Sequence, residues 1–283
     1  MKEYEDNLEW GLTTLDKKMK GIFKTMESEF LRKNELSEKL LAYYEESCLD
    51  QSVLLGSLIS QEAKDFIVNN ANAFIFGLIS DQSTKAELAW SLPFHLKKRL
   101  GHFDMHKMGS EGYEHEIEKA IKDKPALHRY PGRIANYLYL ASKHIINNYQ
   151  ANGANIWSNT DSAKEIICRL CAFKGISSKK AALGTMLLVR DKGVFVKDAH
   201  IIDIAYDIHV RRVFLRIGLV KSDTLEQVTE EAKLIYPDFP GKLTTPIWVI
   251  GREYCRPTNP LCDNCPISNL CERKVHLGGD IRA

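Results

Sequence analysis

The 283-residue sequence has no apolar run that approaches the roughly 20 residues needed to cross a bilayer. Its first ten residues, MKEYEDNLEW, lack the apolar core of a secretory signal peptide. Proline is absent before Pro93, and the only strand-like stretch, GVFVK at 193–197, is too short to found a sheet. These absences argue against a membrane, secreted or sheet-based protein. We therefore expect an all-α, cytoplasmic protein.

No single sign of charge dominates, because the formal net charge is only +2. The charge is nevertheless uneven. Residues 1–70 hold 9 Lys and Arg against 14 Asp and Glu, whereas residues 71–283 hold 30 against 23. The positive charge of residues 71–283 would suffice to bind a polyanion over a limited area. An ordinary charged surface exposed to solvent explains the same counts equally well.

Apolar residues recur at helical spacing along most of the chain. The first such set is Leu8, Leu12, Leu15, Met19, Ile22, Phe23 and Met26. Further helices are predicted over Leu36 to Tyr44 and over residues 71–92, 133–149, 203–217 and 224–235, with Pro93 near a boundary. No period of 20–50 residues repeats, which argues against a solenoid.

Seven cysteines are present, an odd number that argues against a disulfide framework. Four lie close together in a C-x6-C-x2-C-x5-C pattern rich in turn-forming residues: Cys255, Cys262, Cys265 and Cys271. Four thiolates on a tight loop can converge on one zinc ion or one iron–sulfur cluster, and the spacing alone leaves both open. We interpret the pair Cys168 and Cys171 as core packing of a helix.

The cysteine loop also contains Asn259-Pro260 and Pro266 and follows Gly251-Arg252. With these residues it resembles the C-terminal cluster loop of the endonuclease III family of helix-hairpin-helix DNA glycosylases. The resemblance implies that the four cysteines hold a four-iron four-sulfur ([4Fe-4S]) cluster. It runs from about residue 70 to 275, and it implies a fold of two helical domains with the cluster loop at the C-terminus.

The segment at 173–181, FKGISSKKA, resembles the family's hairpin motif Leu-Pro-Gly-Val-Gly-x-Lys-Thr-Ala. Gly175 is kept, whereas Lys174 replaces the proline and Ser177 the second glycine. In this register Lys179 matches the catalytic lysine of the bifunctional members, whose amine attacks the sugar C1′. Lys180 is the alternative nucleophile, but adjacent helical residues point about 100° apart, so only one can face the cleft.

The segment at 206–213, YDIHVRRV, resembles the family's Val-Asp-Thr-His-Val-x-Arg-Val motif, so the resemblance makes Asp207 the catalytic carboxylate. It would help to deprotonate the lysine and stabilise the cationic sugar. A plain helix N-cap is the other interpretation. Lys179 and Asp207 lie 28 residues apart, about ten more than in a standard member, and the extra segment holds the weaker candidates Asp198 and Asp203 and the possible pocket residue His200.

The segment Leu78 to Thr84 resembles the family's Leu-Leu-Ser-x-Gln-x-Thr motif, whose Gln fills the gap left by a flipped base. Gln82 is therefore the wedge candidate. The full set of predicted DNA contacts is Gln82, Gly175, Ser177, Ser178, Lys180 and His209.

The expected organisation is an N-terminal helical extension (1–70) that packs with a cluster domain (201–283, loop 255–271). A helical barrel (71–200) carries the hairpin at about 165–190. The predicted function is a bifunctional DNA glycosylase and abasic-site lyase with a [4Fe-4S] cofactor. It would act as a monomer on double-stranded DNA with a damaged or modified base, near the nucleoid and without a membrane partner. A monofunctional glycosylase, a non-catalytic iron–sulfur nucleic-acid-binding protein and a zinc-containing structural module remain alternatives.

Overall fold

The computed structural model describes residues 2–48, 54, 56 and 58–276, with the path of the helix alone over 2–18. Every regular element in these residues is helical, which confirms the all-α prediction. The α-helices are α1 (Lys2–Tyr43), α2 (Gln61–Asn69), α3 (Ala71–Ser80), α4 (Ala86–Leu100), α5 (Met105–Met108), α6 (Glu114–Lys122), α7 (Pro131–Tyr149), α8 (Ala163–Cys171), α9 (Ser178–Asp191), α10 (Ile208–Ile217), α11 (Leu225–Ile235) and α12 (Thr244–Glu253). Short turns of other helix types are η1 (Tyr44–Cys48), η3 (Gly153–Ile156), η4 (Ala199–Ile201), η5 (Pro240–Leu243), η6 (Cys262–Asn264) and η7 (Ser268–Leu270). None of the described helices is both long and apolar enough to span a bilayer.

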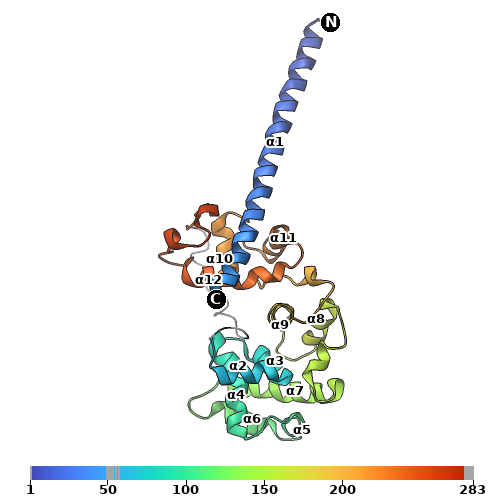
Figure 1. Ribbon diagram of the computed structural model, residues 1–283, viewed down its shortest axis with the longest axis vertical. Helices are drawn as coiled ribbons and strands as arrows, with labels where there is room; N and C mark the ends of the chain where they lie inside the picture. Colours follow the sequence, from blue (N-terminus) through green and yellow to red (C-terminus); the bar gives the residue numbers. More distant parts are fainter. Residues whose placement is uncertain (1, 49–53, 55, 57, 277–283) are drawn as a thin grey trace.

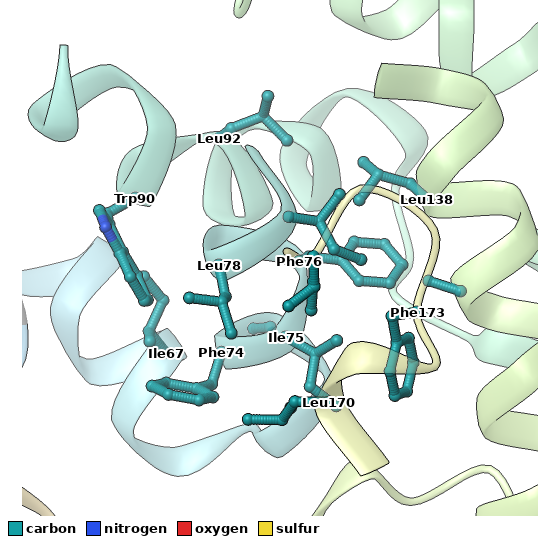
Figure 2. Packing of buried hydrophobic residues seen from close by; sticks show 14 of the residues in the cluster. Ile67, Phe74, Ile75, Phe76, Leu78, Trp90, Leu92, Leu138, Leu170 and Phe173 are labelled. Carbon is teal, nitrogen blue, oxygen red and sulfur yellow. The ribbon is translucent and has the colours of Figure 1, made fainter. Parts of the chain in front are cut away.

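The larger core, which we call the first lobe, extends from Leu54 to Ile202 and contains α2 to α9. Its centre is α3, where every residue from Ala73 to Ser80 is buried. Figure 2 shows Phe74, Phe76 and Leu78 of α3 meeting the side chains of neighbouring helices. Because α3 is apolar all round, it is stable only when helices cover every side of it.

The smaller core, the second lobe, combines α10, α11 and α12 with Leu36 and Leu40 near the end of α1. Ile202 packs in the first lobe and Ile204 in the second, so the chain passes between the lobes at residue 203. The range 1–70 does not pack as one unit, because α2 belongs to the first lobe through Ala63 and Ile67. The apolar face of a short helix does not specify which of two cores it enters.

Helix α1 is continuous and projects far from the body of the protein (Figure 1). The separate helix expected from Leu36 to Tyr44 is instead the last part of α1 and the first residue of η1, because neither proline nor glycine interrupts residues 22–43. Large apolar side chains along its outer part, including Phe23 and Met26, are exposed.

Residues 71–92 fall in two helices, because α3 ends at Ser80 and α4 begins at Ala86, and the helix predicted over 203–217 begins only at Ile208. Two further local expectations differ from the structure. Pro93 lies inside α4, not near its end; the helix loses one main-chain hydrogen bond there and keeps buried neighbours such as Trp90 and Leu96. Residues 193–197 form an irregular segment, in which the Lys197 N–H donates to the carbonyl of Asp161 and Phe195 is exposed.

Candidate active site

The predicted hairpin is formed by α8, a tight turn and α9. Gly175 in this turn has φ of +91°, a region that side chains with a Cβ rarely adopt. The hydroxyl of Ser177 accepts a hydrogen bond from the Lys180 N–H and caps α9. Ser178 is the first residue of α9. The turn therefore presents the N–H groups of a helix N-terminus, an arrangement that binds phosphate.

A cavity of about 890 Å³ lies between the two lobes. Lys179 and Lys180 of α9 line it from the first lobe, and Asp207 and Trp248 line it from the second. The two residues predicted to be catalytic thus meet at one cavity, although 28 residues separate them in the sequence. Its volume falls in the range of small-molecule pockets.

The two lysines differ in their surroundings. The Lys180 amine donates to the carbonyls of Ile79 (2.9 Å) and Gly175 (3.0 Å), and burial lowers its pKa to about 8. Lys179 is exposed at the start of α9 and, among the described residues, makes no hydrogen bond or ion pair. Lys180 is held by the hairpin turn, whereas Lys179 can reach a ligand in the cavity.

Asp207 is the N-cap of α10, as one of the two interpretations made from the sequence expected. Its Oδ1 accepts the N–H groups of His209 (2.9 Å) and Val210 (2.8 Å). Both bonds use the same oxygen while the residue lines the cavity. These bonds fix the carboxylate relative to α10 and leave Oδ2 for a ligand.

The other acidic candidates of the inserted segment have structural contacts elsewhere. Asp198 accepts hydrogen bonds from the Ser162 hydroxyl and the Ala163 N–H at the start of α8. Asp203 forms an ion pair with Lys233 of α11. His200 is exposed and does not line the cavity.

Gln82 and His209, both predicted DNA contacts, lie outside the lining of the cavity. The side chain of Gln82 folds back and donates to the carbonyl of Ile79 at 2.6 Å. His209 packs edge-on against Trp248, and burial lowers the pKa of its imidazole. Insertion of Gln82 into DNA therefore requires the bond to Ile79 to break.

Asp81 is a residue of the cavity wall that the sequence comparison passed over. It occupies the variable position of the Leu-Leu-Ser-x-Gln-x-Thr motif, so the resemblance assigned it nothing. Its Oδ2 accepts a hydrogen bond from the indole N–H of Trp90 at 3.3 Å. Burial raises the pKa of the Asp81 carboxyl, while the positive charge of Lys180 and the Trp90 bond act in the opposite sense. In the sequence, the feature that could have drawn attention to Asp81 is its position as an acidic residue directly after an apolar helix.

The four clustered cysteines line one small cavity together with Arg216. The buried guanidinium of Arg216 lies 3.7 Å from Cys255 Sγ, and the Arg273 N–H donates to Cys271 Sγ at 3.3 Å. Donors of this kind stabilise thiolates and their metal complexes. No set of three or more His, Cys, Asp or Glu side chains in the described part of the chain has the geometry to bind a single metal ion. The structure does show that the sulfur atoms of all four cysteines border the same small cavity.

Cys168 and Cys171 of α8 are exposed, so the expected core packing of this pair is wrong. The buried face of α8 is formed instead by Ala163, Ile166 and Leu170.

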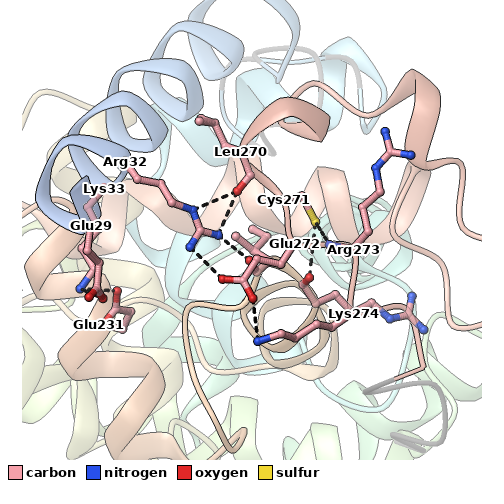
Figure 3. Close-up of polar contacts among 11 residues, drawn as sticks. Glu29, Arg32, Lys33, Glu231, Leu270, Cys271, Glu272, Arg273 and Lys274 are labelled. Atoms are coloured by element: carbon pink, nitrogen blue, oxygen red, sulfur yellow. Dashed lines mark hydrogen bonds and ion pairs between the residues drawn. The ribbon is translucent and has the colours of Figure 1, made fainter. Parts of the chain in front are cut away.

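Helix α1 is attached directly to the cysteine loop (Figure 3). Arg32 of α1 donates to the carbonyls of Leu270 (2.9 Å) and Ile217 (2.6 Å) and forms an ion pair with Glu272. Lys33 forms ion pairs with Glu29 of its own helix and with Glu231 of α11. The last part of α1 is thus an integral part of the second lobe.

No protein-family model matches the chain. It is 27% identical to Endonuclease III of Rickettsia conorii over 251 residues, which cover 88% of this chain and 95% of that protein. It is 38% identical to Endonuclease III of Thermotoga maritima over 81 residues, only 38% of that protein.

Solved structures share the fold at low sequence identity. An Endonuclease III–DNA non-covalent complex has a TM-score of 0.58 at 16% identity, covering 84% of this chain and 93% of that one. A thermostable thymine-DNA glycosylase has a TM-score of 0.58 at 15% identity, covering 86% and 96%. The chain has a helix-hairpin-helix fold of two helical lobes. Over most of its length the chain is similar to Endonuclease III.

Proposed function

We propose that this protein is a bifunctional DNA glycosylase of base excision repair that also cleaves the abasic site. The observation that carries the proposal is the position of Lys179 and Asp207 on walls from different lobes of one cavity. The partner is duplex DNA with a damaged or modified base, bound by a monomer. The N-terminus of α9 would hold a phosphate, and the base would turn out of the stack into the cavity.

The chemistry follows from these two side chains. The neutral amine of Lys179 attacks C1′ while the bond from C1′ to the base breaks, and the departing base takes up a proton. Asp207 accepts a proton from the lysine and stabilises positive charge on the sugar. Ring opening gives a Schiff base. Removal of a C2′ proton then breaks the C3′–O bond, the phosphate leaves, and water releases Lys179.

We further propose that Cys255, Cys262, Cys265 and Cys271 hold a [4Fe-4S] cluster. Their common cavity and the donors from Arg216 and Arg273 support this assignment. A bound cluster would link α12 to the C-terminal loop and order this end of the second lobe. Zinc remains the other metal that four thiolates would accept.

The test is borohydride trapping on duplex DNA with a ready-made abasic site. Wild type should give a covalent adduct, which Lys179→Ala abolishes and Asp207→Asn reduces at least about tenfold. Lys174→Ala is the matched control, because Lys174 is an exposed lysine of the same turn that does not line the cavity. Base release from a duplex that carries a modified base, without an adduct on the abasic site, would instead identify a monofunctional glycosylase, and DNA binding without either activity a non-catalytic protein.

A further inference from the structure

Asp81 is a carboxylate built into the wall of the proposed base pocket. Its neighbour Trp90 is almost fully buried, and the indole N–H fixes Oδ2 at 3.3 Å. Among the described residues Oδ1 has no hydrogen-bond donor, although Asp81 lines the cavity. One oxygen is thus held in place and the other is available to a ligand.

Lys180 supplies the charge that balances this carboxylate. Its amine has three N–H groups, of which two donate to the carbonyls of Ile79 and Gly175. It lines the same cavity; burial raises the pKa of the Asp81 carboxyl, and the positive charge of Lys180 and the Trp90 hydrogen bond oppose that rise. In its ionised form Asp81 only accepts hydrogen bonds, so the wall beside Trp90 then presents an acceptor to whatever enters.

An acceptor of this kind distinguishes two classes of nucleobase. Cytosine-type and adenine-type bases carry an exocyclic amino group that donates, whereas the corresponding oxo bases place a carbonyl oxygen there. A carboxylate pairs with the amino group and repels the carbonyl. Buried polar groups left unpaired in this way give strong discrimination between otherwise similar ligands.

We propose that Asp81 reads an exocyclic amino group of the extruded base, so that the cavity selects amino-bearing bases over their oxo counterparts. Trp90 positions the carboxylate. Trp248, on the wall from the second lobe, provides an aromatic surface on which the base stacks. This assignment rests on the proposed glycosylase function and narrows its class of substrate.

The experiment uses matched duplexes that differ only in the amino or oxo group. One pair carries 5-hydroxycytosine or 5-hydroxyuracil opposite guanine, and the other carries adenine or hypoxanthine opposite the same base. Single-turnover base release is measured for wild type, Asp81→Asn and Asp81→Ala. Glu87→Gln is the control, because Glu87 is another acidic residue that lines the cavity.

Wild type should release the amino member of at least one pair about tenfold faster or more. Asp81→Asn has an amide that also donates, so it should lose or reverse this preference, while Glu87→Gln keeps it. An unchanged ratio in Asp81→Asn overturns the proposal. So does a wild type that prefers oxo bases or releases none of the four.

Trapping on a ready-made abasic site separates this inference from the proposed function, because that site has no base to read. Asp81→Asn should trap as wild type does, which also shows that it folds. Loss of trapping in wild type would contradict the lyase activity, whereas normal trapping with an unchanged base preference would contradict the role of Asp81 alone.

Discussion

A Cβ on residue 175 would lie 2.5 Å from Cδ2 of Tyr137, so the ring of Tyr137 on α7 occupies the space beside the hairpin turn. Gly175 also has φ of +91°. The turn that begins α9 therefore depends on glycine for two separate reasons, one of backbone conformation and one of packing. The motif's second glycine can be replaced by Ser177, because the backbone at that position is extended and any residue can adopt it. The first glycine is kept.

Gly175→Ala should lower the free energy of unfolding by about 2–3 kcal/mol and weaken binding to duplex DNA. Gly193→Ala is the matched control, because Gly193 also has a positive φ (+66°) but no atom within 4 Å of its would-be Cβ. It should cost only about 1 kcal/mol. Chemical denaturation and DNA titration measure both quantities, and an equal loss of stability in the two variants would contradict the role of Tyr137.

Asp191→Asn should destabilise the protein by about 3 kcal/mol. The side chain of Asp191 is fully buried and pairs with that of Arg190, which is 4% exposed. Arg190 also donates to Thr245 at the start of α12, and Tyr44 donates to Asp191, so the pair joins the lobes. Removing one member leaves a buried charge without its partner.

The control for this prediction is Asp161→Asn, which breaks the exposed ion pair with Lys197. Such surface pairs contribute well under about 1 kcal/mol. If the two variants have the same denaturation midpoint, Asp191 does not hold the lobes together.

Lys180 predicts a pH dependence of stability. Burial lowers its pKa to about 8 from the ordinary 10.5, so between these values the unfolded chain binds a proton that the folded protein lacks. The stability of wild type relative to Lys180→Met should therefore rise from pH 8 to pH 10.5, by an amount on the order of 2 kcal/mol. Denaturation of both proteins at pH 7.5 and pH 10 measures this difference. A relative stability that stays level over this range would mean that burial does not lower the pKa of the amine, and one that falls would mean that the folded protein raises this pKa.

Cys271→Ser should remove the visible absorbance near 400 nm that an iron–sulfur cluster gives, and it should lower the Tm. Cys271 lines the small cavity and accepts the Arg273 N–H, whereas Cys168 lies exposed on α8. Cys168→Ser should therefore keep both properties. Metal analysis of the purified protein decides between iron and zinc, and a colourless wild type that contains zinc would contradict the cluster.

The fold class, the hairpin and the grouping of Lys179, Asp207 and the four cysteines could be predicted because each depends on a short local motif. The packing of α2 in the first lobe could not, because Ala63 and Ile67 would fit either core. Asp81 was missed for a related reason: a motif that leaves its position variable carries no information about it. Its proposed role depends on Trp90 of α4 and Lys180 of α9, which only the folded chain brings close to it.

The attachment of Arg32 to Leu270 and Ile217 has a consequence for the order in which the chain folds as it is made. The first lobe comes from one continuous stretch, residues 54–202, so it can fold once that stretch has left the ribosome. The second lobe needs Leu36 and Leu40 of α1 together with residues up to the cysteine loop. Helix α1 therefore packs only after residues up to the cysteine loop have been made, and the proposed pocket, which needs both lobes, forms later than the first lobe.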